Sequence, residues 1–327
     1  MRRREFITLL GGAAAAWPLA ARAQPASVPR IGVLRVAGPA LDNFVVELRQ
    51  GMRDLGHVEG RSFVIEYRWP QDGRIERLPE LATELVRLRV ALIIALGPQP
   101  IQAAKDATKT IPIVMGRMDD ADVHGFVTNY ARPEGNITGM SLPSGEISTK
   151  WLQMLKEILP QGARIAALWD AGGTSNQVRR IGEAARIMGV DLDILPARGP
   201  DDFAQAFAAA KQGGVQGLVI LGSPVMTSQL VPLAKLTVSH RLAASYLYRE
   251  FAEAGGLLGY GPTETDPSFS FRHVAYFVDQ LLRGAKPGDL PVEQPTRFHF
   301  TINRNTADAL GLTIPPHLYI FADEVIE

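Results

Sequence analysis

The chain has 327 residues, of which 46% are hydrophobic, 21% charged and 7% aromatic, and this globular composition excludes collagen-like, disordered and multi-span membrane proteins. The 34 basic residues balance 34 acidic ones, so no charge excess favours a nucleic acid as partner. The chain has no cysteine, which excludes disulfides, thiolate metal sites and a cysteine nucleophile. Because a single core is near its size limit at this length, we expect two domains.

Residues 1–23 have the pattern of an export signal. Arginines at positions 2–4 precede a short run of apolar and small residues that ends in Ala21-Arg22-Ala23, which is typical of a secretory signal peptide. The pair Arg3-Arg4 before Phe6-Ile7 also matches the twin-arginine signal, although the general secretory route remains an alternative. We expect cleavage after Ala23 and a periplasmic protein, with no stable insertion in the membrane because no later segment is long and apolar enough.

Short apolar runs alternate with helical stripes in the first half of the remaining chain. The expected strands are Arg30–Leu34, Ser62–Tyr67, Val90–Leu96 and Ile111–Met115, and the expected helices are Val45–Leu55, Ile75–Leu88 and Pro98–Thr108. This alternation predicts a parallel sheet with helices on both faces.

The same pattern begins again after residue 146. The expected strands are Arg164–Trp169, Asp191–Leu195, Gly217–Leu221, Ala243–Tyr246, Leu257–Tyr260 and Phe298–Ile302. The expected helices are Ile147–Ile158, Val178–Met188, Asp201–Gln212, Met226–His240 and Phe269–Leu282, with a short one ending at Leu310. The chain is therefore predicted to be an α/β protein with two Rossmann-like lobes, and ligands of such sheets bind beyond the carboxyl ends of the strands.

Motifs for the common cofactors and catalytic groups are missing. The first strand-to-helix turn, Leu34–Pro39, contains no G-x-G-x-x-G, and the chain has no Walker A motif, no G-x-S-x-G and no H-E-x-x-H. We therefore expect no cofactor, no metal, no catalytic residues and no enzyme activity. One alternative stays open, because Asp119, Asp120 and Asp122 follow a predicted strand and could hold a cation in a metal-assisted enzyme.

The loops at the predicted strand ends supply candidate ligand-binding residues. Gly97 and Gln99 begin a helix whose free N–H groups suit a carboxylate, and Asp120 is an acceptor for an ammonium group. Ser223 offers a hydroxyl, and Tyr246 and Tyr248 are expected to cover an apolar or ring portion of a ligand as a lid. The full candidate set is Ala37, Gly38, Gly97, Gln99, Asp120, Ser141, Asn176, Ser223, Tyr246 and Tyr248.

Longer motifs occur in a specific order along nearly the whole chain after the leader. They are Gly51–Arg61, Ile65–Trp69, Arg77–Ala82, Ala131–Gly139, Tyr248–Phe251, Gly255–Leu257, Tyr260–Pro262, Leu290–Pro295 and Leu310–Pro316. In this order they resemble the ABC-transporter substrate-binding proteins of the tryptophan/tyrosine-binding type. The chain departs from that family's usual Gly-Asp-Pro-Val at 119–122, where only Asp120 matches, and from its usual Thr-Pro pair at Gly97-Pro98.

The resemblance implies a type I periplasmic binding protein with three crossover segments and a ligand enclosed between two lobes. The crossovers would be Gly139–Leu142, Gly261–Pro262 and Pro295–Arg297. We accordingly expect one lobe from residues 28–138 and 262–295, and the other from 139–261 and 296–327. The implied function is that of a monomeric receptor that carries an amino acid, or an aromatic or carboxylate compound, to an inner-membrane ABC permease. A ligand-sensing subunit of a signalling protein is the alternative.

Overall fold

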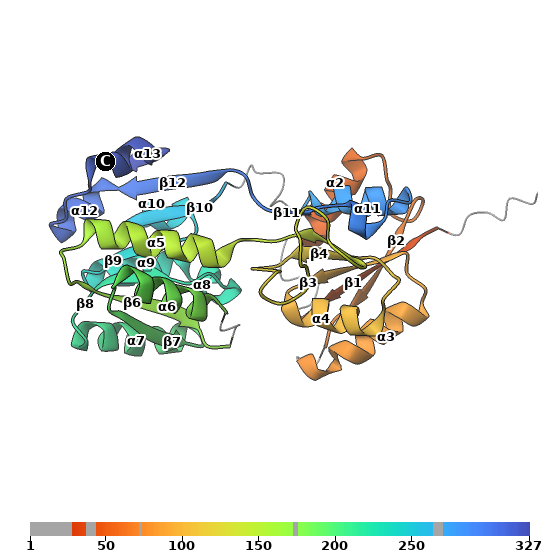
Figure 1. Cartoon of the computed structure of the whole chain (residues 1–327), viewed down its shortest axis with the longest axis horizontal. Coiled ribbons are helices and arrows are strands. Elements are labelled where there is room, and N and C mark those ends of the chain that lie inside the picture. Colours follow the sequence, from red (N-terminus) through yellow and green to blue (C-terminus); the bar gives the residue numbers. More distant parts are fainter. Residues whose placement is uncertain (1–27, 37–43, 72–73, 173–175, 264–270) are drawn as a thin grey trace, which may run out of the picture.

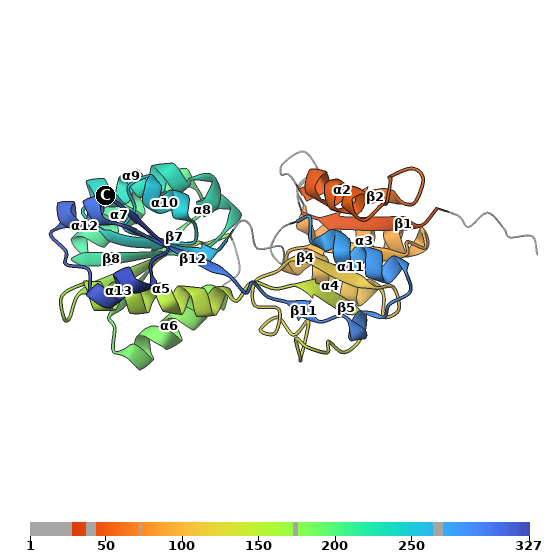
Figure 2. The same cartoon turned by 90° about the horizontal axis from the view of Figure 1, so that it is seen from above.

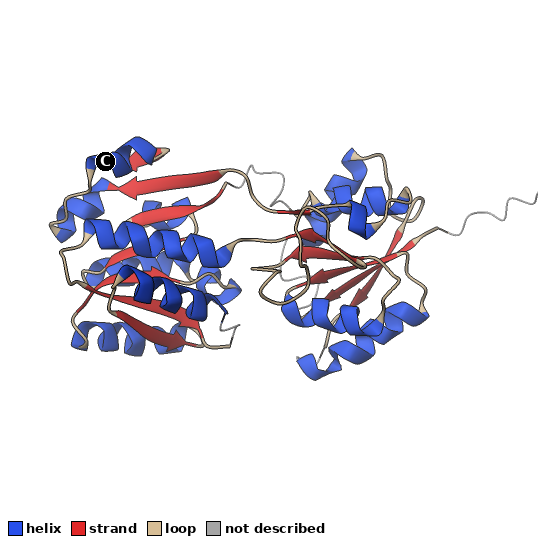
Figure 3. Ribbon diagram, in the orientation of Figure 1, coloured by secondary structure: helices blue, strands red, loops and turns tan. Residues whose placement is uncertain are grey.

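Each half of the molecule is built around its own β-sheet. The computed structural model describes residues 28–36, 44–71, 74–172, 176–263 and 271–327, and the predicted leader lies outside these ranges. Figure 1 shows the two sheets in two separate lobes, which are joined by a few extended segments of chain. Both lobes alternate strands with helices along the chain, as Figure 3 shows.

The first lobe contains a six-stranded sheet in which the paired strands run parallel, in the order β11-β5-β4-β3-β1-β2. The strands are β1 (Arg30–Arg35), β2 (Val64–Arg68), β3 (Leu92–Leu96), β4 (Ile113–Arg117), β5 (Ile137–Met140) and β11 (Val292–Glu293). The helices are α2 (Phe44–Asp54), α3 (Leu78–Arg87), α4 (Pro98–Ala107) and α11 (Val274–Leu282), with short 3₁₀ turns at Ile75–Arg77 and Pro287–Asp289.

Alternate residues of β3 explain why this sheet is covered on both faces. Leu92 and Ile94 pack in the core that α2 and α11 complete, whereas Ile93 and Ala95 pack in the core of α3 and α4. All four side chains are fully buried, which is why the sequence of this strand is a continuous apolar run.

The second lobe contains a seven-stranded sheet in the order β13-β12-β10-β9-β8-β6-β7, in which only β10 and β12 pair antiparallel. The strands are β6 (Arg164–Asp170), β7 (Leu192–Ala197), β8 (Val215–Ile220), β9 (Ala243–Tyr246), β10 (Leu258–Pro262), β12 (Phe298–Asn303) and β13 (Glu324–Ile326). The helices are α5 (Ser144–Ile158), α6 (Asn176–Met188), α7 (Pro200–Gln212), α8 (Pro224–Ser228), α9 (Leu230–Ser239), α10 (Arg249–Glu253), α12 (Arg304–Leu310) and α13 (Pro316–Phe321). Figure 2 shows α5 and α6 on one face and α7, α9 and α10 on the other.

The predicted fold class, an α/β protein with two parallel-dominated sheets, is confirmed. One predicted helix, Met226–His240, is divided into α8 and α9. Pro232 lies in the first turn of α9, where it cannot donate to the carbonyl of Ser228 and its ring would clash with that carbonyl, so one helix cannot run through both segments. The predicted helix Phe269–Leu282 begins only at Val274 among the residues that the structure describes.

The chain passes between the sheets three times: from β5 to α5, after β10, and from β11 to β12. Gly139 lies in β5, just before the first of these crossovers, with φ of 127°. A Cβ atom there would overlap with the backbone oxygen of Met115 on the neighbouring strand, so this position requires glycine. Among the described residues, no helix has the length and apolarity that a membrane crossing requires.

Candidate functional site

A cavity of about 730 Å³ lies between the two lobes, and residues of both lobes line it. Its volume falls in the range of about 300–1,000 Å³ that is usual for small-molecule sites. Many of its residues stand at the carboxyl ends of parallel strands, where open α/β sheets bind ligands. These residues are Arg35, Leu96 and Met118 from the first lobe and Trp169, Leu221 and Leu247 from the second.

Aromatic rings form a large part of the apolar lining. Trp151 is 2% exposed, and its indole N–H donates to the backbone oxygen of Tyr260 across 2.8 Å, so its ring is fixed in place. Trp169, at the end of β6, and Phe271 are only partly buried and also line the cavity. Three rings around one cavity offer a surface for an apolar or aromatic part of a ligand.

Charged side chains lie among these rings. Arg35 is 5% exposed at the end of β1, and Asp119 and Asp170 bring carboxylates from the first and second lobe respectively. The carboxylate of Asp170 accepts a hydrogen bond from the backbone N–H of Gly172 across 2.9 Å. Both signs of charge are thus present, so the cavity can hold a ligand that carries a carboxylate, an amine or both.

Gln177, at the start of α6, contacts two other parts of the site: the loop after β8 and the first lobe. Its amide N–H donates to the carbonyl of Gly222 across 3.0 Å, and its amide oxygen accepts from the N–H of Gly222 across 3.1 Å. The same amide nitrogen lies 3.4 Å from Oδ2 of Asp119 in the other lobe. Gln177 therefore fixes the loop after β8 and also contacts the first lobe.

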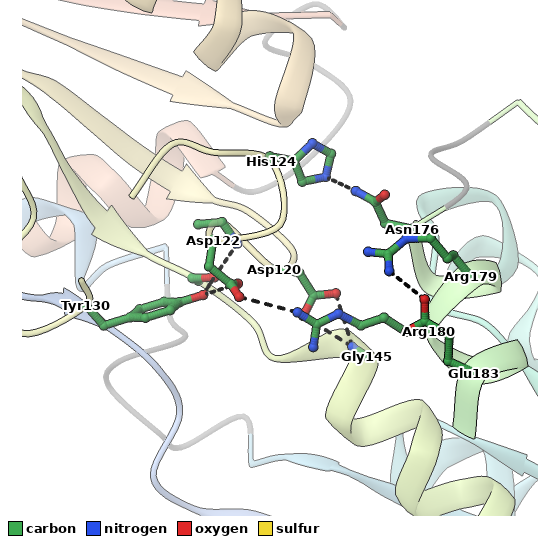
Figure 4. A network of polar contacts seen from close by, with 11 residues as sticks. Asp120, Asp122, His124, Tyr130, Gly145, Asn176, Arg179, Arg180 and Glu183 are labelled. Atoms are coloured by element: carbon green, nitrogen blue, oxygen red, sulfur yellow. Dashed lines mark hydrogen bonds and ion pairs between the residues drawn. The ribbon is translucent and has the colours of Figure 1, made fainter. Parts of the chain in front are cut away.

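Further polar contacts join the lobes beside the cavity, as Figure 4 shows. Asn176 donates its amide N–H to Nε2 of His124 across 2.9 Å. Burial lowers the pKa of His124, which keeps the ring neutral and able to accept that bond near pH 7. Asp122 accepts a hydrogen bond from the hydroxyl of Tyr130 across 2.7 Å and pairs with Arg180 across 3.3 Å.

The pKa values of two neighbouring aspartates move in opposite directions. Asp120 is 3% exposed, and this burial raises the pKa of its carboxyl to about 6, even though the backbone N–H of Gly145 donates to it across 3.1 Å. For Asp122, partial burial also favours the neutral form, but the bonds from Tyr130 and the backbone and the charge of Arg180 hold its pKa below the usual value. Burial raises the pKa of Tyr130 to about 12, so it stays a hydrogen-bond donor.

Three of the residues predicted from the sequence line the cavity: Gly97, Gln99 and Ser223. Ser223 accepts a bond from the backbone N–H of Met226 as the cap of α8, and a hydroxyl that accepts in this way still has a hydrogen to donate. Ala37 and Gly38 lie outside the described residues.

Other predicted residues stand beside the cavity lining rather than in it. Asp120 binds the start of α5, and Ser141, fully buried, accepts from the backbone N–H of Ala121 across 3.1 Å. Asn176 binds His124, which does line the cavity. Their roles as ligand contacts stay predictions, and Asp119 occupies the place in the lining that was expected for Asp120.

The two tyrosines predicted to form a lid pack in the second lobe instead. Tyr246 is fully buried, its hydroxyl lies 2.9 Å from the hydroxyl of Thr227, and its ring meets those of Tyr248 and Phe251 edge-on. Tyr248 is partly buried against the same core. Since Thr227 lines the cavity, Tyr246 supports the wall from behind rather than facing it.

The acidic run 119–122 does not converge on a point where a cation would bind. Asp119 contacts Gln177, Asp120 contacts Gly145, and Asp122 contacts Tyr130 and Arg180. Within the described part of the chain, no group of three or more His, Cys, Asp or Glu side chains is arranged to hold a metal ion. The geometry gives the metal-assisted enzyme no support.

Several lining residues were not singled out from the sequence, among them Arg35, Trp151, Gln177 and Phe271. Arg35 could have been found, because it directly follows the predicted strand Arg30–Leu34 and precedes the candidate residues Ala37 and Gly38. Trp151 and Gln177 follow helical patterns that do not distinguish the core from the cavity.

Comparison with known proteins finds matches that cover nearly the whole chain. The model of a family described as ABC transporter substrate binding protein matches residues 30–326. A tyrosine-binding protein of Clostridioides difficile (strain R20291) is 22% identical over 280 residues, which cover 85% of this chain and 79% of that protein.

Two solved structures have a similar fold. One is an ABC domain from Streptococcus pneumonia in complex with L-Trp, at 23% identity and a TM-score of 0.71, covering 92% of this chain and 100% of that one. The other is a conserved domain protein of Vibrio cholerae O1 biovar El Tor, at 23% identity and a TM-score of 0.72, covering 91% of this chain and 99% of that one. The type I periplasmic binding protein fold that the resemblance implied is thereby confirmed.

Proposed function

The chain belongs to the family of ABC transporter substrate binding proteins, and from this premise we propose that it is an exported receptor that delivers a small molecule to an inner-membrane ABC importer. The observation that carries the proposal is the cavity of about 730 Å³ at the carboxyl ends of both sheets, lined from both lobes. A ligand held there contacts two bodies at once, so its binding energy favours their closed arrangement.

The chemistry of the lining supports an amino acid, or an aromatic or carboxylate compound, as the ligand. Trp169 and Phe271 offer ring faces, Arg35 offers a cation for a carboxylate, and Asp119 and Asp170 offer acceptors for an amine. A relative is named as tyrosine-binding, and a similar structure holds L-Trp, which supports the same class for this chain.

Residues 1–23 support export as part of the proposal. Their basic start, short apolar middle and Ala21-x-Ala23 end are those of a cleaved leader, and the Arg3-Arg4 pair suits the twin-arginine route. On this proposal the mature protein works in the periplasm as a monomer, with lobes of residues 28–138 plus 262–295 and 139–261 plus 296–327.

A thermal-shift screen of the chain lacking residues 1–23 tests the ligand class. The compounds are amino acids, aromatic acids and sugars, and a ligand at 100 times its Kd adds about 2.7 kcal/mol to stability, which is an easily measured shift. We expect stabilisation by at least one amino acid or aromatic acid, checked by calorimetry. A folded protein that responds only to sugars, or to none of the three classes, would contradict the proposed ligand.

A further inference from the structure

Arg180 belongs to α6 of the second lobe, yet its guanidinium binds the first lobe. Its Nη2 donates to Oδ2 of Asp122 across 3.3 Å, in the loop that follows β4. The other carboxylate oxygen, Oδ1, accepts from the hydroxyl of Tyr130 across 2.7 Å. The acceptor is thus held in place by its own lobe, and the donor comes from the opposite lobe (Figure 4).

Gly145 gives Arg180 its path to the first lobe. A Cβ atom at position 145 would overlap with Cδ of Arg180 and would lie 2.9 Å from its Nε. Gly145 is the second residue of α5, so it lies in the first turn of that helix. Because this position carries no side chain, it leaves a notch over which the side chain of Arg180 passes.

The neighbouring residue shows that this placement is not general for α6. Arg179 donates to Glu183 of its own helix across 2.8 Å, and its side chain is 51% exposed. The side chain of Arg180 is only 25% exposed. Of these two adjacent arginines, Arg179 therefore makes a contact within its own helix, and Arg180 makes a contact between the lobes.

Asp122 and Arg180 do not line the cavity, but they lie beside residues that do. Asp119 and His124 flank Asp122 in the sequence and line the cavity, as does Gln177, which precedes Arg180 by less than one helical turn. Moving Arg180 away from Asp122 therefore moves two walls of the cavity relative to each other.

We propose that Arg180, lying over Gly145 and paired with Asp122, is a positioning residue that holds the two lobes together beside the first crossover. It acts without touching the ligand, and it favours the arrangement in which both lobes bound the cavity. The effect of Arg180 on ligand affinity rests on the proposed function. Its effect on the arrangement of the lobes does not.

The distance between two spin labels, one on each lobe, measures the arrangement of the lobes. Since the chain has no cysteine of its own, labels attach only at cysteines that are introduced at chosen sites. Val46→Cys on α2 and Ala208→Cys on α7 put one label on an exposed position of each lobe. We expect Arg180→Gln to shift the interlobe distance distribution to longer distances and to broaden it. Arg179→Gln is the matched control and should leave the distribution as in the parent.

Gly145→Ala separates this role from simple stability. Alanine favours the helix but displaces the side chain of Arg180, so the variant should keep its melting temperature and show the longer distances of Arg180→Gln. Asp122→Asn should resemble Arg180→Gln, and combining the two should add little to either one. Unchanged distances in Arg180→Gln, or an equal change in Arg179→Gln, would overturn the proposal.

Binding of L-tryptophan, used as the probe, gives the functional consequence. We expect Arg180→Gln to raise its Kd about two- to fivefold, the effect of a partly exposed ion pair, mainly through faster release. An unchanged or lowered Kd alongside binding by the parent would contradict the proposal. If the parent does not bind the probe, the proposed ligand class is in question, and the label distances still decide the role of Arg180.

Discussion

The indole N–H of Trp151 donates to the backbone oxygen of Tyr260, so a wall of the cavity is anchored to the strand from which the chain leaves the second lobe. Trp151→Phe removes the donor of this hydrogen bond and opens a small void at a buried side chain. We expect a loss of about 1–3 kcal/mol in the free energy of unfolding, measured by urea denaturation. Trp169→Phe, in the same cavity but partly exposed, should cost less. Equal losses would contradict a structural role for the bond to Tyr260.

Trp169 is expected to contact the ligand through its ring. Trp169→Ala should weaken binding of an aromatic ligand by about 1–2 kcal/mol, or roughly 5- to 30-fold, whereas Trp169→Phe should retain most of the affinity. Calorimetry on the two variants measures the difference. Trp69→Phe, which replaces a tryptophan outside the cavity lining, is the control and should bind as the parent does. Equal affinity in Trp169→Ala and in the parent would remove the ring from the site.

Asp120 should make the folded protein less stable as the pH rises from about 4 to about 6. Burial raises the pKa of Asp120 to about 6 from an ordinary 3.8, so the folded state holds the proton more tightly than the unfolded state. The stability from this proton is fully present below pH 4 and is lost as the pH passes 6. Asp120→Asn is neutral at every pH and tolerates the φ of 48° at this position. We expect it to be more stable than the parent by roughly 1–3 kcal/mol at pH 7.5, with the difference vanishing near pH 4.

The neighbouring Asp122→Asn should show the opposite sign. The pKa of Asp122 is lowered, so its charged form stabilises the fold above its ordinary pKa and loses that effect as the pH falls. This variant should be less stable than the parent at pH 7.5, and the difference should shrink on acidification. Urea unfolding at pH 4.5, 6 and 7.5 measures both variants. The same sign for the two would contradict the opposed pKa shifts.

Export is expected to depend on the arginine pair of the leader. Changing Arg3 and Arg4 to lysine keeps the charge but removes the twin-arginine pattern, so an uncleaved precursor should accumulate in the cytoplasm. Cell fractionation with detection of the precursor and mature forms measures this. Arg2→Lys lies outside the pair and should be exported normally. Normal export of the double variant would instead indicate the general secretory route.

The strand pattern predicted the fold well because strands buried on both faces are continuous apolar runs between helical stripes. Val90–Leu96 shows this most clearly, since β3 takes up Leu92–Leu96 of that run. A continuous apolar run, however, does not reveal which of its side chains face the core and which face the cavity. Tyr246 is the last residue of β9, whose four residues are all buried. The strand therefore has no alternation of polar and apolar residues that would have shown that Tyr246 faces the core.

Local backbone conformation explains why Asp119 lines the cavity although Asp120 was predicted to do so. Asp119 and Asp120 are adjacent and chemically identical, and the sequence favoured Asp120. In the structure Asp120 has a φ of 48°, which is uncommon outside glycine, and its carboxylate caps α5 while that of Asp119 lies at the cavity. Such a conformation is set by the neighbouring segment Leu142–Gly145, which no local pattern at residue 120 reveals.

The late position of α11 in the chain constrains how the protein is made. This helix covers one face of the first sheet, and Val274 and Phe277 on it are fully buried against that face. Strand β11, at the edge of the same sheet, comes later still. A growing chain on the ribosome therefore presents every residue of the second lobe through β10 before the first sheet can be finished. Neither lobe can reach its final form until synthesis is nearly over, because the second sheet in turn needs β12 and β13. A chaperone that meets the nascent protein would find the apolar face of the first sheet uncovered until then.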